Sequence, residues 1–347
     1  SQFDMDDVEK LGYLKLDILG QTTLSVMRMC QQLMGRDNPT DFSWIPNDDP
    51  AACKAMRAGR VDTGIFHVEG FTKSKGGKEL GIKTTSDAIL MQGLYMPGAM
   101  DTGQKDLYVQ RRKNPAERKA VTYIHDVFRE SLEWTHGTVI FQEQVINIMR
   151  GLGMGIAGIN TFFKIVKSSG AGAVEANQER LADMRVEFDS LCIAAGIDED
   201  RLDEAWHLTS GFVAYGFNLA HATGYGIRSY RTAYLKTHYP LEYMTALLTA
   251  WAGKTSPKKG QPPKETLYQR EARRIGIKIL SPDVNKSGAT WTMDKKNNAI
   301  RRGIVSIKGV GAATAQEIAD NAPYTDLDDL IARTDSRKVT GSNFSVD

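Results

Sequence analysis

The sequence predicts a mixed α/β protein that is predominantly α-helical, and three observations lead to this prediction. Residues 120–250 carry long runs with helical periodicity, the longest at 174–195 and 227–251. Apolar and polar residues alternate over residues 13–20, as in a strand with one buried face. Residues 277–307 look β-rich and irregular.

The helices in the first two thirds of the chain have recognisable ends. Thr22 or Thr23 is predicted to cap a helix that extends to residue 34. Residues 50–115 look mixed, because many Gly and Lys residues break the pattern. The turn His238-Tyr239-Pro240 is predicted to split the last long helical run, since proline disfavours helix in the residue before it.

Length, charge and cysteine content exclude several classes of protein. The 347 residues predict two or three domains and carry a formal net charge of +2. No stretch approaches the roughly 18 consecutive apolar residues of a membrane span, and the acidic start lacks the features of a signal peptide. Cys30, Cys53 and Cys192 are too few and too far apart for a disulfide framework or a zinc site. We therefore expect a cytoplasmic protein without a membrane partner.

The balanced net charge hides two basic regions. Residues 254–278 contain eight basic and two acidic residues, and their first ten read as a linker or an exposed loop. A second basic group comprises Lys105, Arg111, Arg112 and Lys113. A polyanionic partner explains both regions, and so does an ordinary solvated surface.

Asp17 is a candidate metal ligand at the end of the predicted first strand. A carboxylate at a strand end is well placed to hold a hard cation such as Mg²⁺, which takes oxygen ligands. One carboxylate does not make a metal site, and a lone Asp in a strand also serves as a turn or cap residue. Spacing alone leaves both interpretations open.

A Gly-rich turn near the end of the chain predicts a contact with phosphate. The sequence Lys308-Gly309-Val310-Gly311 precedes a helix predicted from about residue 312 to 320. Glycines let a backbone approach a phosphate closely, and the start of the next helix offers free N–H groups. The expected apolar frame is present at Ile304, Ile307, Val310, Ala315 and Ile318. The alternative is a plain Gly-rich turn.

A third motif combines aromatic, small and basic residues. The segment Tyr215-Gly216-Phe217-Asn218-Leu219-Ala220-His221 precedes a helix that bears Arg228, Arg231 and Lys236. Such a mixture suits stacking on a base and charge pairing with phosphates. A core aromatic cluster beside a solvated helix face explains the same pattern, and the segment alone favours that explanation.

Taken together, these segments resemble the C-family DNA polymerases of bacteria, the DNA polymerase III alpha subunits. The similarity spans almost the whole chain, and its motifs occur in the family order. The matching segments are Gln2-Phe3-Asp4-Met5, Leu14-Lys15-Leu16-Asp17-Ile18-Leu19-Gly20, Asp62-Thr63-Gly64-Ile65-Phe66-His67-Val68-Glu69, Leu94-Tyr95-Met96-Pro97-Gly98-Ala99-Met100-Asp101, Phe141-Gln142-Glu143-Gln144-Val145, Tyr215-Gly216-Phe217-Asn218 with His221, Ser229-Tyr230, Thr232-Ala233 and Leu235-Lys236-Thr237-His238-Tyr239-Pro240, Pro282-Asp283-Val284-Asn285, and the Gly309-Val310-Gly311 turn.

The resemblance implies three regions with distinct roles. Residues 1–20 are the last part of the palm, residues 21–270 are fingers that receive the incoming dNTP, and residues 271–347 are a helix-hairpin-helix region that binds DNA. Asp17 is implied to be one of three palm aspartates that hold two Mg²⁺ ions, which activate the primer 3′-hydroxyl and stabilise the leaving pyrophosphate.

The resemblance also implies ligands for individual residues and partners for the whole protein. The implied nucleotide-binding residues are Lys164, Lys167, Tyr215, Asn218 and His221, and the implied DNA-binding residues are Lys308, Gly309, Val310 and Gly311. The implied partners are primer-template DNA, dNTP, a sliding clamp, other replisome proteins and the remaining polymerase segments.

Departures from the family pattern limit these expectations. The other two palm aspartates of the family lie upstream of the matching region, so we expect this chain alone to be inactive and to be part of a larger protein or complex. Met96 stands where Arg is usual, and Leu219-Ala220 where Lys-Ser is usual. We interpret the chain as a divergent, phage-encoded polymerase. The alternative is a non-catalytic DNA-binding or replisome interaction module that was derived from polymerase fingers.

Overall fold

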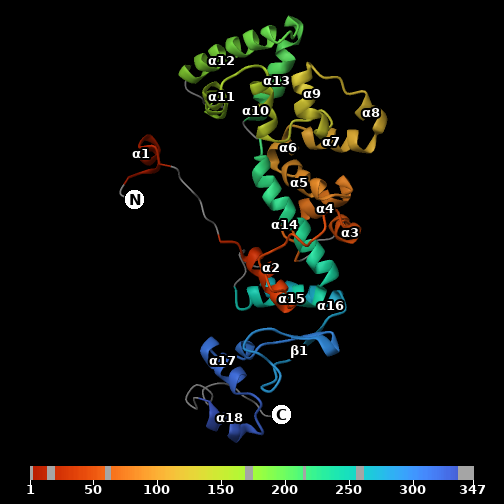
Figure 1. The fold of residues 1–347 in the computed structure, drawn as a ribbon, viewed down its shortest axis with the longest axis vertical. Helices are drawn as coiled ribbons and strands as arrows, with labels where there is room; N and C mark the ends of the chain where they lie inside the picture. Colours follow the sequence, from red (N-terminus) through yellow and green to blue (C-terminus); the bar gives the residue numbers. More distant parts are fainter. Residues whose placement is uncertain are drawn as a thin grey trace. The chain divides into compact units, whose positions relative to one another are not determined.

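The structure, a computed structural model, describes residues 3–13, 20–58, 64–168, 175–213, 216–254 and 262–334. Within them the chain is mainly helical and has one three-stranded sheet, which confirms the predicted fold class (Figure 1). It forms two compact units. The central unit is Ser43–Tyr239, and the terminal unit combines Ser1–Phe42 with Pro240–Asp347. Most of the strand predicted at residues 13–20 lies outside the described residues.

The described elements of the two units are as follows. The central unit contains α3 (Pro50–Arg57), α4 (Phe71–Leu80), α5 (Thr85–Leu94), α6 (Pro97–Asp101), α7 (Gln104–Lys113), α8 (Pro115–Lys119), α9 (Asp126–Leu132), η1 (Glu133–Thr135), α10 (Gln142–Gly151), α11 (Ile156–Ser168), α12 (Glu175–Ala194), η2 (Glu199–Arg201), α13 (Leu202–Val213) and α14 (Leu219–His238). The terminal unit contains α1 (Met5–Lys10), α2 (Thr22–Leu33), α15 (Pro240–Trp251), α16 (Lys264–Arg274), β1 (Lys278–Leu280), β2 (Thr292–Asp294), η3 (Lys295–Asn297), β3 (Ala299–Arg301), η4 (Ile304–Ser306), α17 (Ala312–Asn321) and α18 (Leu327–Arg333).

The long helix α14 organises the central unit and packs against α5 and α3 (Figure 1). A glycine permits the close approach to α5: a Cβ atom at Gly226 would lie 2.7 Å from Cγ1 of Ile89. The helix begins at Leu219, earlier than its apolar pattern indicates. It ends at His238, and α15 starts at Pro240, so the predicted split is confirmed.

Two local predictions need correction. Residues 50–115 are not mixed but hold a series of short helices, because proline begins α3 and α6, and Thr84 and Asp87 form a capping box for α5. A glycine inside α4 reflects packing, since a Cβ at Gly76 would meet the ring of Tyr95 at 2.7 Å. Neither predicted threonine caps α2: Gln21 occupies the N-cap position, and its side chain does not cap the helix.

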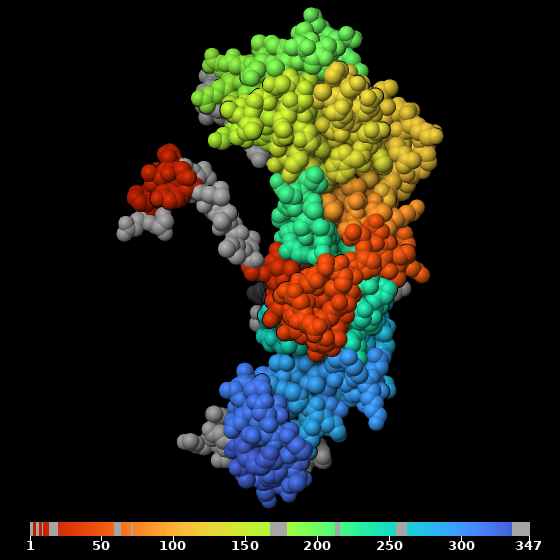
Figure 2. All heavy atoms as spheres, viewed as in Figure 1, coloured from red at the N-terminus to blue at the C-terminus, as the bar shows by residue number. Residues whose placement is uncertain are grey.

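Helices α9 to α13 enclose one hydrophobic cluster of the central unit, with Phe128, Phe162 and Phe188 fully buried. Trp206 packs edge-on against Phe162 and Phe188, with ring centroids 5.7 Å and 5.4 Å away. Figure 2 shows the atoms of this region, in yellow and green, as one continuous body. The exposed surface of α11, which carries Lys164, is therefore supported by a well-packed core.

The sheet of the terminal unit is small and mixed. β3 pairs in parallel with β1 and antiparallel with β2, with Ile300 opposite Ile279 and Met293. The strands have only three residues each. This matches the prediction of a β-rich but irregular segment after residue 277, and the segment leads directly into η4 and the Gly-rich turn.

Candidate functional site

The Gly-rich turn before α17 has the geometry expected of a backbone contact site. Gly309 has a φ of +92°, which a residue with a side chain rarely adopts. Gly311 is the N-cap of α17 and supplies no side-chain cap, and a Cβ at this position would have no atom within 4 Å. The first turn of α17 is thus accessible, and Lys308 beside it is exposed.

An apolar frame holds this turn in place. Val310 is buried, its N–H donates to the carbonyl of Ile307 at 3.1 Å, and it packs in a cluster with Ile304, Ala315 and Ile318. Ile307 packs against the same cluster. All five apolar positions predicted for the frame are therefore confirmed, and they fix a turn that exposes its backbone.

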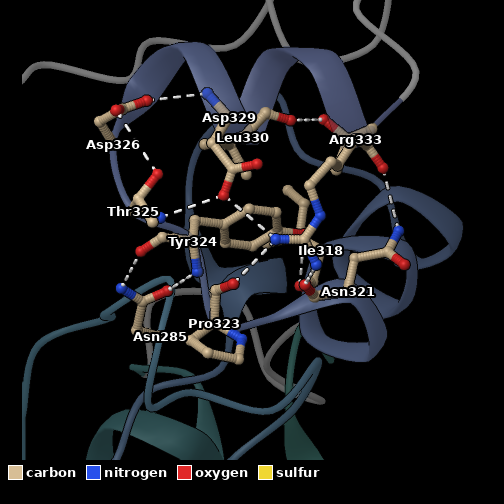
Figure 3. Close-up of polar contacts among 11 residues, drawn as sticks. Asn285, Ile318, Asn321, Pro323, Tyr324, Thr325, Asp326, Asp329, Leu330 and Arg333 are labelled. Atoms are coloured by element: carbon tan, nitrogen blue, oxygen red, sulfur yellow. Dashed lines mark hydrogen bonds and ion pairs between the residues drawn. The ribbon is translucent and has the colours of Figure 1, made fainter.

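The Pro282-Asp283-Val284-Asn285 motif supports the frame from a distant part of the sequence. The amide of Asn285 donates to the carbonyl of Tyr324 at 2.9 Å and accepts from its N–H at 2.7 Å (Figure 3). The hydroxyl of Tyr324 donates to the carbonyl of Ile318 in α17 at 2.8 Å. The motif thus ties the segment between β1 and β2 to the turn after α17.

Arg333 of α18 closes the other end of α17. Its guanidinium donates to the carbonyls of Asn321 and Pro323 and to Asp329, and it lies over the ring of Tyr324 (Figure 3). These bonds satisfy carbonyls that a helix C-terminus leaves without partners. The turn between α17 and α18 is therefore occupied by internal contacts, in contrast to the open Gly-rich turn before α17.

In the central unit, the start of α14 is closed by two side chains. Glu143 of α10 accepts the N–H of Leu219 at 2.7 Å, and Asn218 accepts the N–H of His221 at 2.7 Å. Gln142, next to Glu143, donates to the carbonyl of Gly216 at 2.6 Å. Asn218 thus has a structural role as a helix cap. The start of α14 is therefore closed by side chains, whereas the start of α17 has no side-chain cap.

One face of α14 carries a row of aromatic and basic side chains. His221, Tyr225 and Arg228 have the spacing of residues on one helix face. The ring of His221 stacks on Tyr225 with centroids 4.2 Å apart, and the guanidinium of Arg228 lies 4.5 Å from the same ring centre. Arg228 also lies 5.2 Å from the ring of Phe66.

The loop before α4 brings a second histidine to this row. His67 lies edge-on to Tyr225 at 4.6 Å and has a φ of +59°, which is uncommon for a residue other than glycine. The ammonium of Lys73 lies 2.7 Å from Nδ1 of His67 and 2.8 Å from Oε1 of Gln92. Burial lowers the pKa of Lys73 to about 8, and burial and the Lys73 charge lower the pKa of His67.

Sequence reasoning missed His67, Lys73 and Glu143 as functional or positioning residues. Glu143 and His67 lie in segments that carry the family resemblance, and this was the available signal. Lys73 lies in a Lys- and Gly-rich helix with no distinguishing pattern. Its contact with Gln92 spans 19 residues and depends on how α4 packs on α5.

The remaining predicted site residues stand as follows. Lys164 is exposed on α11, and His221 is exposed on α14. Asp17 and Tyr215 lie outside the described residues, as does the side chain of Lys167. The structure therefore brings His221 to a cluster that also contains Tyr225, Arg228, His67 and Lys73, which the sequence did not reveal.

The basic group at residues 105–113 is largely structural. Lys105 pairs with Asp106 at 2.6 Å and with Glu79 at 3.3 Å. Arg112 makes two bonds to the buried carboxylate of Asp87, at 2.7 Å and 2.9 Å. Arg111 donates to the carbonyl of His136 at 2.7 Å. These internal partners explain the group better than a polyanion does.

Within the described residues, no three His, Cys, Asp or Glu side chains lie close enough to hold a metal ion. These residues therefore do not fit a magnesium site of their own. Cys30, Cys53 and Cys192 are buried free thiols. None of the helices searched in this part of the chain has the length and apolarity to cross a membrane.

Two protein families match consecutive parts of the chain. The family described as bacterial DNA polymerase III alpha subunit finger domain matches residues 23–186. The family described as helix-hairpin-helix motif matches residues 276–345, which include the Gly-rich turn. The DNA polymerase III subunit alpha of Aquifex aeolicus is 31% identical to this chain, and the similarity covers 98% of this chain's residues. The chain belongs to the bacterial DNA polymerase III alpha subunit family.

Further relatives in the alpha subunit family show the same coverage. The chain is 31% identical to the DNA polymerase III subunit alpha of Pseudomonas aeruginosa and 29% identical to that of Thermus aquaticus. Each similarity covers 98% of this chain's residues. It spans 28% of the length of the Aquifex protein, and 29% and 27% of the other two. The similarity therefore concerns one segment of much longer alpha subunits.

Proposed function

We propose that this chain is the fingers and helix-hairpin-helix segment of a replicative DNA-directed DNA polymerase. The complete protein would transfer nucleotides from dNTPs to a primer 3′-hydroxyl. One combination of features carries the proposal. The chain matches the finger-domain family and then the helix-hairpin-helix family. The first part of the chain carries Arg228 and its neighbours on α14, and the second part contains the open Gly-rich turn. We propose that the fingers extend to about residue 270 and the DNA-binding region from there.

The fingers segment would receive the incoming nucleotide. Lys164, Lys167, Tyr215 and His221 are the proposed contacts, and the exposure of Lys164 and His221 is compatible with this role. Asn218 would act through His221, because its side chain already accepts the N–H of that residue. Charge-assisted bonds from lysine to phosphate are stronger than neutral ones, so the lysines would contribute chiefly to nucleotide affinity.

The helix-hairpin-helix segment would bind DNA through its backbone. Lys308, Gly309 and Gly311 would contact phosphates, while the buried Val310 would hold the turn in shape. Such contacts position a duplex without reading its sequence. A sliding clamp and other replisome proteins in the bacterial cytoplasm are the further partners that we propose.

Chemistry at the primer terminus would require the complete polymerase. Asp17 is the proposed contribution of this chain to the site of two Mg²⁺ ions, and the other carboxylates would come from segments upstream. We therefore expect no template-directed extension by this chain alone, since one carboxylate cannot position two metal ions.

A primer-extension assay tests the proposal. The complete polymerase that contains this segment should extend a primer on a template, and this chain alone should not exceed a heat-killed control. If the complete protein bound duplex DNA but failed to extend, the non-catalytic DNA-binding module would be the correct interpretation. If the chain alone extended primers and Asp17→Ala abolished this, the requirement for upstream residues would be wrong.

A further inference from the structure

The central unit contains a half-buried lysine whose described contacts include no carboxylate. Lys73 donates to His67 and Gln92, and neither carries a negative charge. We propose that Lys73 and His67, together with Arg228 and His221, bind the triphosphate group of the incoming nucleotide. The inference rests on the proposed polymerase function and adds residues that the motifs did not indicate.

The surroundings of Lys73 favour an anion. A partly buried ammonium is costly unless an opposite charge balances it, and lysine is rarely buried without such a partner. Gln92 supplies only a dipole, and its own amide donates to the hydroxyl of Ser229 at 3.3 Å. Lys73 is therefore held in place by neutral groups, and a bound phosphate would supply the missing charge.

His67 and Lys73 meet at the amide oxygen of Gln92. Nδ1 of His67 lies 2.7 Å from the ammonium of Lys73 and 3.1 Å from Oε1 of Gln92, to which Lys73 also donates at 2.8 Å. Nδ1 accepts from the ammonium in one ring tautomer and donates to Gln92 in the other. The residue is exposed, and its ring packs beside those of Phe66 and Tyr225, with centroids 4.9 Å and 4.6 Å away. Its left-handed backbone conformation is strained, and such strain concentrates at ligand sites.

The ring of Tyr225 is already in contact with two neighbouring side chains. His221 stacks on its ring, and Arg228 lies over the same ring. A nucleobase would have to displace one of them in order to stack. The cluster consequently offers N–H donors and positive charge, which suit the phosphates of a nucleotide and not its base.

The ionisation of the pair gives the proposal a pH signature. Burial lowers the pKa of Lys73 to about 8, whereas a bound anion favours its charged form. Phosphate affinity should therefore be greatest below pH 8 and decline as the pH rises through about 8. The charged and titratable groups that face His67 are Lys73, His221 and Arg228, and each lowers its pKa.

Titration of the purified chain with inorganic tripolyphosphate tests the site. The ring NMR signals of His67, identified through His67→Gln, should shift on binding. Lys73→Met should weaken binding about tenfold or more, the usual effect of losing a charge-assisted bond. Lys78→Met changes the same charge on an exposed residue of the same helix and should leave binding nearly unchanged. Thermal unfolding of each variant controls for folding.

A conservative variant separates charge from structure. Lys73→Arg should keep most of the affinity but lose the decline near pH 8, because arginine stays charged there. The comparison with wild type also cancels the titration of tripolyphosphate itself. Binding that is insensitive to both Lys73→Met and pH would overturn the proposal, as would His67 signals that shift with a single-stranded oligonucleotide but not with tripolyphosphate. Normal primer extension by the complete polymerase alongside either result would leave the proposed function intact.

Discussion

Asp17 is the residue through which this chain would take part most directly in the chemistry. In the complete polymerase, Asp17→Asn should remove most of the turnover and leave DNA affinity nearly unchanged, because a metal ligand acts chiefly on the chemical step. Single-turnover extension and DNA titration of the same preparation measure the two quantities. Near-normal turnover in the variant would make Asp17 a structural turn residue.

Lys164 and Lys167 are the residues for which a nucleotide role is easiest to separate from DNA binding. Lys164→Ala and Lys167→Ala should raise the KM for dNTP more than they weaken DNA binding, since a cation on a triphosphate contributes to nucleotide affinity. Steady-state extension over a range of dNTP concentrations provides the measurement. Lys119→Ala, an exposed lysine of α8, is the control. An equal loss of DNA affinity would place these lysines on the DNA path instead.

At the scale of elements, side chains in the segments that carry the family resemblance also join helices. Glu143 links α10 to α14, and Asn218 closes the first turn of α14. The face of α14 that carries His221, Tyr225 and Arg228 is therefore set by contacts at the helix start. A substitution at Glu143 would alter that face without touching a ligand.

The bond between Arg112 and Asp87 joins α7 to α5 and yields a stability prediction. Asp87 is 5% exposed and also accepts the backbone N–H groups of Lys83 and Thr84. Arg112→Met leaves this buried carboxylate without its cation and should lower the free energy of unfolding by roughly 3–5 kcal/mol. Denaturant unfolding of the purified chain measures the loss.

The neighbour of Arg112 provides a matched control. Lys113→Met removes a positive charge from an exposed side chain of the same helix, so its effect should stay within about 0.5 kcal/mol. A similar loss in both variants would show that overall charge matters, not the bond to Asp87.

At the scale of the whole molecule, duplex DNA should bind weakly, without sequence preference and with steep salt dependence. Counterions released from phosphates determine that dependence. Gly311→Val should weaken binding by blocking the backbone approach, because this position has open space and an ordinary φ of −77°. Gly309→Val should have the same effect but also strain the turn, so circular dichroism must confirm that this variant folds.

Titrations of two unrelated duplexes at two salt concentrations measure the effect. Gly155→Val, at another glycine with open space, just before α11, serves as the control. A strong preference for one duplex, or no binding at low salt, would contradict the backbone contact.

The sequence alone determined much of the secondary structure and the family. Proline at 240 ended the run of α14, and the apolar spacing around Val310 specified the frame of the Gly-rich turn, because both effects act over a few residues. The order of several motifs identified the alpha subunit family before any contact was known. Periodicity failed at residues 50–115, where Gly76, Gly77 and Gly93 lie inside helices and are required there by tight packing.

Only the tertiary structure decided what the polar side chains do. Arg112 looked like part of a polyanion site, but it bonds to Asp87, 25 residues away. Asn218 caps α14, a role that its place in the motif did not indicate, and Lys73 carried no signal until folding placed it beside His67 and Gln92. The physical reason is that a charge or an amide has the same appearance in sequence whether its partner is solvent, a ligand or a distant residue. Folding brings together groups whose separation along the chain has no characteristic period.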